Sequence, residues 1–196
     1  EAYYDKSTFG TVSGNAYTGE EGYVGLRRGI LQGQYNSWSQ GSSCMKVAAS
    51  DNIVVFRASE VAFLRAEGAL RGWNMGGSPK DLYEAGIRLS FEENNISSGV
   101  ESYLANTGKV EGYKDPLKGQ SGQTYDYSGS INTAVTVAWA GGDFEKSLEQ
   151  IITQKWIANF PNGMESWSEY RRTGYPKLMP MAANASSGIV GDTEGA

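Results

Sequence analysis

The sequence predicts a mainly α-helical fold, built from tetratricopeptide-like helical hairpins that carry long, irregular loops rich in aromatic residues. Two regions show apolar residues at three- and four-residue spacing, which indicates amphipathic helices rather than strands. Gly and Pro residues divide each region into pieces of ordinary helix length. The 26 Gly and 12 Tyr among 196 residues favour long loops around these helices.

The first helical region extends from Arg57 to Glu93 and has about the length of one tetratricopeptide repeat, roughly 34 residues. Its first half contains a ridge of small residues that lets another helix approach closely, at Ala58, Ala62, Ala66 and Ala69. A second helix is predicted to begin after Ser78, because this hydroxyl cap, Pro79 and Asp81 follow one another in the order that a helix N-terminus prefers. The two helices are expected to form an antiparallel hairpin.

Three further patterns predict local structure. Glu67 and Arg71 lie four residues apart, in the favourable order for an ion pair on a helix. Ser98 and Glu101 have the spacing of a capping box, so a short helix is expected to begin at Ser98. The β-branched residues between Ile131 and Trp139 favour an extended segment.

The second helical region begins after Asp143, a predicted N-cap, and repeats apolar residues every four positions. We expect one buried face from Leu148, Ile152, Trp156 and Phe160, with Ile151 filling the stripe. Trp156 is therefore assigned to the core. Pro161 ends this helix, Asn162 is placed to cap the next one, and Gly174 is placed to end it.

Three blocks occur in a specific order along the chain. They are GYVGLRRGI from Gly22 to Ile30, then SEVAFLRAEGALRGWNMGG with LYEAGIRLSFEE, and IITQKWIANFPNGMESWSEYRRTGYPKL from Ile151 to Leu178. Together they resemble the C-terminal half of the SusD/RagB-like family, glycan-binding lipoproteins of the outer membrane in Bacteroidetes. In that family the R-R-T-G-Y-P turn belongs to the scaffold. The resemblance implies that the two arginines of this turn pair with inward acids such as Glu67 or Glu165.

The resemblance also implies that the chain is the C-terminal part of a SusD-like protein, as a fragment or a processed chain. We expect a single partial domain over residues 1–196. Its expected segments are a loop-rich segment 1–56, a helical hairpin with a short helix 57–108, a loop insertion 109–142, a helical pair 143–178 and a tail 179–196. The signal and lipid anchor of the family would lie at an N-terminus outside these residues.

Charge and composition argue against several classes of function. The net charge is −5 and no basic run is present, which argues against nucleic acid, because its phosphates are bound by clustered Lys and Arg. The sequence has no His and a single cysteine, Cys44. It therefore lacks the Ser-His-Asp and Cys-His catalytic arrangements and any cysteine-based zinc site. We expect no cofactor and no metal.

Four aromatic residues are the candidates for ligand binding: Tyr35, Trp38, Trp73 and Trp139. An aromatic ring can stack on the C–H face of a sugar while nearby amides and hydroxyls bond its OH groups. Tyr35 and Trp38 lie three residues apart in polar sequence, which leaves them free to act as a stacking pair. Trp73 lies at the predicted hairpin turn, where it either faces a ligand or fills the turn itself. The alternative for each ring is that it packs a loop onto the helices.

Three functions stay open. The resemblance implies non-catalytic binding of an oligosaccharide or polysaccharide at the cell surface and delivery to a SusC-like TonB-dependent transporter of the outer membrane. A peptide ligand stays open as well, because RagB-like members are associated with peptide uptake. The second function is a helical-repeat adaptor that binds protein. The third is a glycosidase, which would need two of the 22 acids held about 5–10 Å apart. The resemblance also implies one further partner, the remaining N-terminal part of the protein to which this chain belongs.

Overall fold

The computed structural model describes the helical part of the chain and short stretches of the rest. The described residues are 11–12, 15–16, 27–29, 49–50, 53–109, 113, 126–127 and 135–182. The chain divides into two compact units. Unit 1 consists of Glu1–Asn52, Glu111–Ile131 and Met179–Ala196, and unit 2 of Ile53–Val110 and Asn132–Leu178.

The described residues of unit 1 form short backbone pairings and include the buried Arg27. A two-stranded antiparallel sheet is made by β1 (Thr11–Val12) and β2 (Asn15–Ala16). An isolated bridge joins Tyr113 and Tyr127. The guanidinium of Arg27 donates hydrogen bonds to the backbone oxygens of Asp126 at 3.2 Å and Pro180 at 3.3 Å. It also lies over the Tyr127 ring at 5.0 Å. Arg27 thus links three distant stretches of unit 1.

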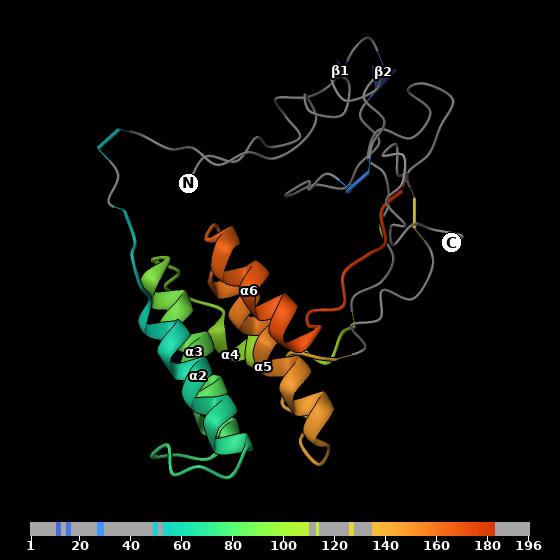
Figure 1. Ribbon diagram of the computed structural model, residues 1–196. Helices are drawn as coiled ribbons and strands as arrows, with labels where there is room; N and C mark the ends of the chain where they lie inside the picture. Colours follow the sequence, from blue (N-terminus) through green and yellow to red (C-terminus); the bar gives the residue numbers. More distant parts are fainter. Residues whose placement is uncertain are drawn as a thin grey trace. The chain divides into compact units, whose positions relative to one another are not determined.

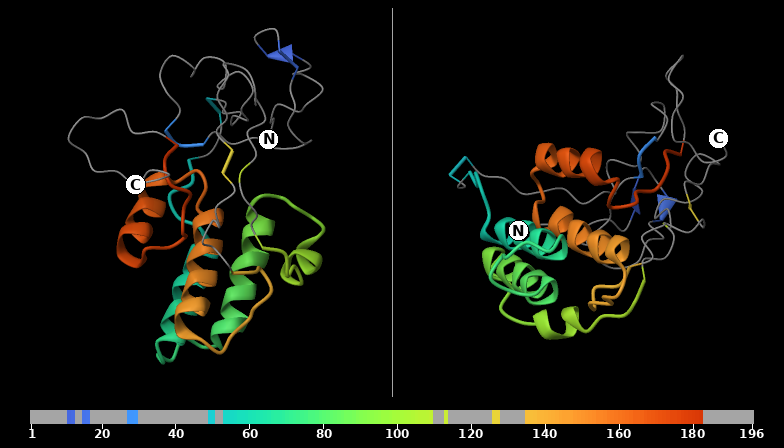
Figure 2. Two further views of the ribbon diagram at one scale, coloured as in Figure 1. Left: turned by 90° about the vertical axis from the view of Figure 1, so that its right-hand side faces the viewer. Right: turned by 60° about the horizontal axis from the view of Figure 1, so that its bottom comes forward.

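Unit 2 is helical, as the sequence predicts. Its helices are α2 (Ala58–Leu70), α3 (Pro79–Glu93), α4 (Val100–Leu104), α5 (Phe144–Ala158) and α6 (Gly163–Thr173). Helix α2 packs against both α3 and α5, and α6 packs against α5 (Figure 1). Figure 2 shows the same helices from two other sides. The mainly α fold with helical hairpins is confirmed.

The α2–α3 hairpin forms where the sequence predicts it. The Ser78 hydroxyl oxygen accepts a hydrogen bond from the Asp81 backbone N–H at 3.1 Å, and Pro79 is the first residue of α3. This is the predicted cap, and it satisfies a backbone donor that a helix start leaves unpaired. Between the helices, Gly72 and Gly76 have φ values of +85° and +77°, a conformation that favours glycine.

The short helix α4 begins one residue later than its capping box predicts. Its N-cap is Gly99, with φ of +88° and no side-chain cap. The Glu101 carboxylate instead binds the guanidinium of Arg88 on α3. The predicted capping box of Ser98 is therefore wrong. The described part of the predicted extended segment, residues 135–139, is irregular rather than a strand.

The α5–α6 pair has the predicted caps but a different buried face. The Asp143 carboxylate accepts a hydrogen bond from the Lys146 N–H at 2.9 Å, Asn162 caps α6, and Gly174 ends it with φ of +75°. Leu148, Ile151 and Ile152 are buried as predicted. Trp156 is 39% exposed and Phe160 is 57% exposed, so the prediction that they belong to the buried face is wrong.

Helix geometry explains this error. Each residue advances the helix by about 100°, so positions four apart drift by about 40° per step around the axis. By Trp156, two steps after Leu148, the drift carries the side chain out of the buried face, and Phe160 lies beyond the end of α5. The inward position in the last turns of α5 is taken by Lys155, which is 1% exposed, and by Ala158.

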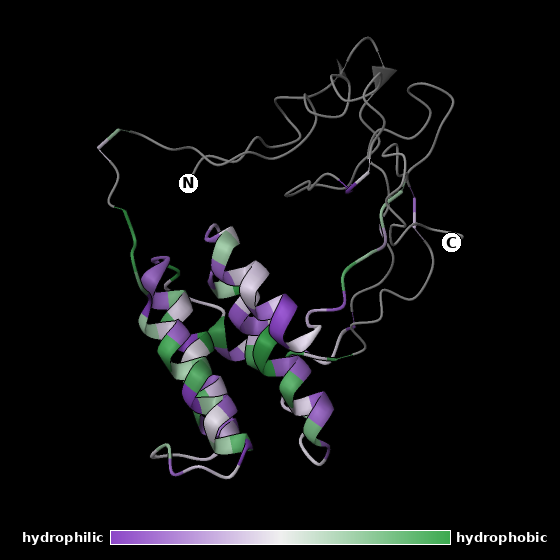
Figure 3. Cartoon of the chain, in the orientation of Figure 1, coloured by the Kyte–Doolittle hydropathy of each residue, from purple (hydrophilic) through white to green (hydrophobic). Residues whose placement is uncertain are grey.

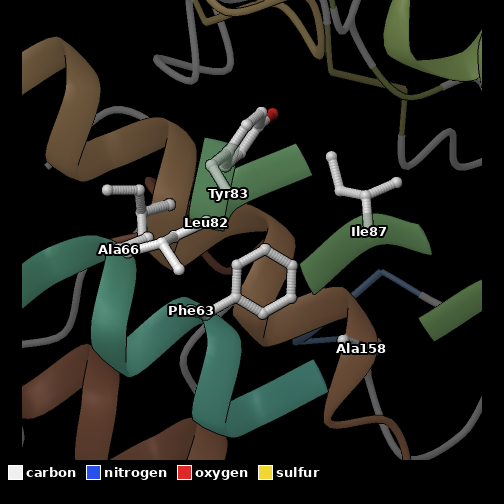
Figure 4. Close-up of a cluster of buried hydrophobic side chains, with 7 residues drawn as sticks. Phe63, Ala66, Leu82, Tyr83, Ile87 and Ala158 are labelled. Carbon is white, nitrogen blue, oxygen red and sulfur yellow. The ribbon is translucent and has the colours of Figure 1, made fainter. Parts of the chain in front are cut away.

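The hydrophobic core lies between α2, α3 and α5 (Figure 4). It consists of Phe63, Ala66, Leu82, Tyr83, Ile87, Ile151 and Ala158. Helices α2 and α3 are in tight contact at Gly86, where an added Cβ would lie 2.7 Å from the Phe63 ring. A small residue on α3 therefore lets the large ring of α2 fill the gap between the two helices.

Candidate functional site

Two of the four predicted ligand-binding residues can be placed in the structure. Tyr35 and Trp38 lie outside the described residues. Trp73 follows the end of α2, and Trp139 lies near the start of α5. Both tryptophans belong to the end of unit 2 where α2 ends and α3 and α5 begin, which we call the Trp73 end. This is the end opposite the α5–α6 turn (Figure 1).

The turn that carries Trp73 is held by backbone and side-chain hydrogen bonds. The Trp73 N–H donates to the Gly68 carbonyl at 3.0 Å. The Arg65 guanidinium donates to the Met75 carbonyl at 3.1 Å through Nε and 2.7 Å through Nη2. The Asn74 side-chain oxygen accepts from the Gly76 N–H at 3.4 Å. These hydrogen bonds order the turn that carries Trp73, and the amide-bearing Asn74 follows Trp73 directly in the sequence.

Met75, and not Trp73, packs against the core at this turn. Met75 lies over Gly68, where an added Cβ would be 2.9 Å from its Cγ, and it packs against the core cluster. Only one edge of Trp73 reaches the same glycine, at 3.4 Å from that Cβ position. The Trp73 side chain is consequently 63% exposed. Its ring has the exposure that stacking on a ligand requires.

Trp139 lies in a segment that is bound to the helices. Its ring packs against Tyr83, with 5.1 Å between centroids. The Gln150 amide of α5 fixes the preceding backbone, donating to the carbonyls of Thr136 and Ala138 at 2.8 Å each. The ring is half-buried at the edge of the core. A ligand-binding role for Trp139 stays a prediction.

Two further aromatic residues, missed in the sequence, are Phe144 at the start of α5 and Tyr175, which contacts the start of α5 from beyond the end of α6. The Arg71 guanidinium lies 5.6 Å from the centroid of the Phe144 ring, which is partly exposed. The Tyr175 hydroxyl donates to the Glu145 carboxylate at 2.9 Å. Burial and the neighbouring Glu145 raise the pKa of Tyr175 to about 12, so it stays a neutral donor at pH 7. The Trp73 end therefore carries exposed ring surface, while the Arg71 guanidinium and the Tyr175 hydroxyl next to it are bound to Glu67 and Glu145.

A buried ionic network occupies the other chemically notable place in unit 2, between α2, α5 and α6. The Lys155 ammonium lies 3.5 Å from Glu60, 3.1 Å from Glu165 and 3.2 Å from Glu169. Burial raises the pKa of the Glu60 carboxyl although Lys155 is beside it. Lys155 was not singled out in the sequence, and the helical drift along α5 is the signal that would have placed it inward.

The same network confirms the predicted pairing for Arg172 of the R-R-T-G-Y-P turn, whereas Arg171 lies over the Trp167 ring. The Arg172 guanidinium donates to Glu67 at 2.7 and 2.6 Å and to Glu169 at 2.7 Å. Arg71 also binds Glu67, at 2.7 Å, as its four-residue spacing predicts. Burial opposes ionisation of Glu67, but the hydrogen bonds from Arg172 and Arg71 outweigh it and lower its pKa. The pairing is bidentate, which fixes α6 against α2.

The predicted pairing of Glu165 is different, since its partner is Lys155 rather than an arginine. Cations of the scaffold thus bind four acids of unit 2, namely Glu60, Glu67, Glu165 and Glu169, whereas Oε1 of the buried Glu149 has no hydrogen-bond partner. Within the described ranges, no group of three or more His, Cys, Asp or Glu side chains is arranged to hold a metal ion. None of the helices in that part of the chain is both long and apolar enough to cross a bilayer.

Comparison with known proteins identifies the family. The sequence matches the SusD-like family, described as "Susd and RagB outer membrane lipoprotein", over residues 1–196. No curated protein matches. Among solved structures, a SusD homologue from Bacteroides ovatus is 87% identical, with a TM-score of 0.86, and the match covers 99% of this chain and 39% of that one.

Two further SusD homologues are similar over most of this chain. One from Bacteroides uniformis is 47% identical, with 92% of this chain and 36% of that one covered and a TM-score of 0.78. A chitin-binding homologue from Flavobacterium johnsoniae is 46% identical, with 85% and 34% covered and a TM-score of 0.71. The chain therefore spans well under half the length of the structures that it matches. Together with the helical hairpins and the Arg172–Glu67 pairing, these matches show that the chain belongs to the SusD-like family.

Proposed function

We propose that the protein is a non-catalytic glycan-binding subunit of the outer membrane, which captures oligosaccharide or polysaccharide at the cell surface. The observation that carries this proposal is membership of the SusD-like family, together with the similarity to a chitin-binding homologue at 46% identity. The finer parts of the proposal are a lipid-anchored location on the cell surface and delivery of the glycan to a SusC-like TonB-dependent transporter. Both follow from the family and concern the complete protein.

The mechanism is capture without bond chemistry. Trp73 is proposed to stack on a sugar ring, because it is exposed and carried by an ordered turn. An ordered turn reduces the conformational entropy lost on binding. Tyr35, Trp38 and Trp139 are proposed to add further ring surface in the same protein. Polar groups such as Asn74 and the guanidinium groups of the Trp73 end are suited to hydrogen bonds with sugar hydroxyls.

The positions of the acids favour binding over hydrolysis. A glycosidase needs one carboxyl free to donate a proton and another free to attack or to activate water. In unit 2 the inward carboxylates of Glu60, Glu67 and Glu169 are bound by Lys155 or Arg172 instead. Their chemistry is that of scaffold ion pairs.

The test is a titration of soluble glycans, chito-oligosaccharides first, into the complete protein, followed by calorimetry. Saturable binding with no release of reducing ends is the expected result. Release of reducing ends that a single carboxylate substitution abolishes would identify a glycosidase and refute the proposal. Binding of peptides but of no glycan in the panel would refute the ligand class. Co-purification with another protein, with no glycan bound, would favour the adaptor.

A further inference from the structure

A small pocket lies between the last turns of α3 and α5, with α4 beside it. Helices α3 and α5 each line it with three residues at positions i, i+3 and i+4, beginning with Ile87 on α3 and with Gln154 on α5. Side chains at this spacing lie on one face of a helix, so each helix presents one continuous face to the pocket. We call it the Gln154 pocket.

The innermost lining of the Gln154 pocket is apolar. Phe63, Ile87 and Ala158 are at most 4% exposed and come from three different helices (Figure 4). Phe91 and Tyr103 lie beside them and pack against each other, with 5.4 Å between ring centroids. None of the lining residues is an acid, a lysine or an arginine. The pocket is therefore suited to an uncharged group, because an ion would lose its hydration there without gaining a partner.

One buried polar side chain of this pocket has a free donor. Gln154 is 7% exposed, and its Oε1 accepts a hydrogen bond from the Tyr103 hydroxyl at 3.0 Å. Nε2 of the same amide has no hydrogen-bond partner among the described residues. Buried polar groups are nearly always hydrogen-bonded, since an unpaired one costs free energy. The Gln154 amide thus indicates that an acceptor belongs in the pocket.

The pocket has room for a small group only. Its volume is about 40 Å³, and at its open side Ile157 is 46% exposed. One water needs about 10–15 Å³ of such space, so the pocket holds a group of about three heavy atoms and excludes a whole sugar ring.

The chemistry of the lining selects among small groups. Water would satisfy Gln154 Nε2 but would leave the apolar residues wet. A methyl group attached to a carbonyl satisfies both, because the oxygen accepts from Nε2 and the methyl lies against the apolar lining. The Ser90 hydroxyl also lines the pocket and has no partner among the described residues, so it can accept a hydrogen bond from an amide N–H. These groups together match an acetamide.

The free donor distinguishes the Gln154 pocket from other apolar parts of unit 2. The run 53–56, which leads into α2, is exposed at all four positions and is drawn green in Figure 3. Its side chains offer no polar group that would orient a ligand. A binding site combines an apolar lining with a few placed polar groups, and the Gln154 pocket has both.

We propose that the Gln154 pocket binds the acetamido group of an N-acetylated sugar, with the carbonyl oxygen accepting from Gln154 Nε2 and the methyl group on the apolar lining. The sugar ring stays outside the pocket, next to Ile157. The proposal rests on the proposed glycan binding and narrows the ligand class to glycans that carry N-acetyl groups. The contact is separate from the ring stacking assigned to Trp73.

The test compares two neutral tetrasaccharides by calorimetry with the complete protein. Chitotetraose and cellotetraose have the same β-1,4-linked backbone and differ only in carrying an acetamido group or a hydroxyl at C2 of each ring. The unaltered protein is expected to bind chitotetraose about tenfold more tightly, through one hydrogen bond and one buried methyl group.

Two variants locate this preference. Gln154→Glu keeps the acceptor for Tyr103 and replaces the donor by an oxygen. Ile157→Trp fills the open side of the pocket from an exposed position, so the fold does not depend on it. Both variants are expected to bind the two tetrasaccharides within about twofold of each other, with the affinity for cellotetraose unchanged. Val61→Trp, at a position that is 38% exposed and outside the pocket lining, is the matched control and should keep the preference. Circular dichroism melting shows whether each variant is folded.

Equal affinities of the unaltered protein for the two tetrasaccharides would overturn the pocket proposal and leave glycan binding in place. Binding of other glycans but of neither tetrasaccharide would do the same. A preference for chitotetraose that persists in both folded variants would place the recognition of the acetamido group elsewhere and would also overturn the proposal. No binding of any glycan would refute the proposed function and the pocket proposal together.

Discussion

Replacement of Lys155 by methionine tests how the ionic network stabilises unit 2. Methionine has nearly the length of lysine but no charge, so Lys155→Met removes the ammonium without opening a large cavity. Lys155 is 1% exposed and lies within 3.5 Å of Glu60, Glu165 and Glu169. After the change, Glu169 keeps Arg172 and Glu165 keeps partial access to water, with 34% of its side chain exposed. Glu60 loses the one cation that contacts it among the described residues.

The expected loss of stability follows from that uncompensated carboxylate. Removing one partner of a buried ion pair costs about 3–5 kcal/mol, and we expect about 3 kcal/mol at pH 8, since Glu60 can partly relieve the cost by binding a proton. The pKa of Glu60 is already raised by burial above its usual 4.5 in the folded protein. A raised folded pKa favours folding at low pH, and this contribution is lost as the pH rises through the folded pKa. Removing Lys155 raises that pKa further, so the deficit of the variant grows from pH 5 to pH 8.

Urea unfolding followed by circular dichroism at pH 5 and pH 8 measures both effects. Lys80→Met is the matched control, because Lys80 is exposed and forms only a 3.7 Å surface pair with Glu84. That control is expected to cost less than about 0.5 kcal/mol. Lys155→Met combined with Glu60→Gln is expected to recover part of the loss. A deficit below about 1 kcal/mol for Lys155→Met, or one that does not depend on pH, would refute the reasoning.

Three shorter predictions concern the same unit. Gly86→Ala is expected to cost about 1–3 kcal/mol in thermal unfolding, because its Cβ would meet a core ring at 2.7 Å. The control Gly163→Ala has open space around it and should be neutral or slightly stabilising. Equal effects of the two substitutions on stability would contradict the tight contact at Gly86. Arg172→Gln is expected to cost about 1–3 kcal/mol at pH 7. Arg172 lowers the pKa of Glu67, so the stability that this pair contributes is present above the usual carboxyl pKa and lost on acidification. In denaturant titrations the loss of stability in the variant should therefore shrink towards pH 3. A loss that stays constant with pH would contradict the pairing. Ser78→Ala should cost about 1 kcal/mol by loss of the α3 cap, with Ser78→Gly costing only a few tenths, and no change in the midpoint for Ser78→Ala would contradict the cap.

Local features of the fold could be predicted from the sequence because their causes are local. The caps at Ser78, Asp143 and Asn162 depend on a side chain and a backbone N–H three residues away, so spacing alone defines them. The Gly174 stop is local in the same way. The capping box at Ser98 failed because a partner on another helix, Arg88, binds the glutamate, and no local pattern shows that competition.

It was harder to predict which side chains face the core in a helix that has apolar residues on more than one side. Phe63 lies between apolar neighbours in α2, so periodicity did not distinguish it as the main core residue of that helix. A strict four-residue pattern placed Trp156 and Phe160 inward. Helical drift along α5 turns Trp156 outward and brings Lys155 in, and Phe160 lies beyond the end of the helix.

The candidate site could be predicted in composition but not in geometry. The sequence indicated Trp73 at a turn and left open whether its ring fills that turn. The choice between Trp73 and Met75 depends on which side chain reaches the space over Gly68, and this is set by the packing of α2 on α3. The structure places Met75 there, which is why Trp73 is exposed.

Calorimetry of Trp73→Ala in the complete protein tests the proposed binding most directly, using the glycan that binds best to the unaltered protein. Loss of a stacking ring is expected to weaken binding by about 1–3 kcal/mol, with the melting temperature nearly unchanged because the side chain is 63% exposed. Leu64→Ala, a change of a partly exposed apolar residue on the outer side of α2, should leave the affinity unchanged. Unchanged glycan affinity in Trp73→Ala, or a large fall in melting temperature with binding intact, would contradict the account.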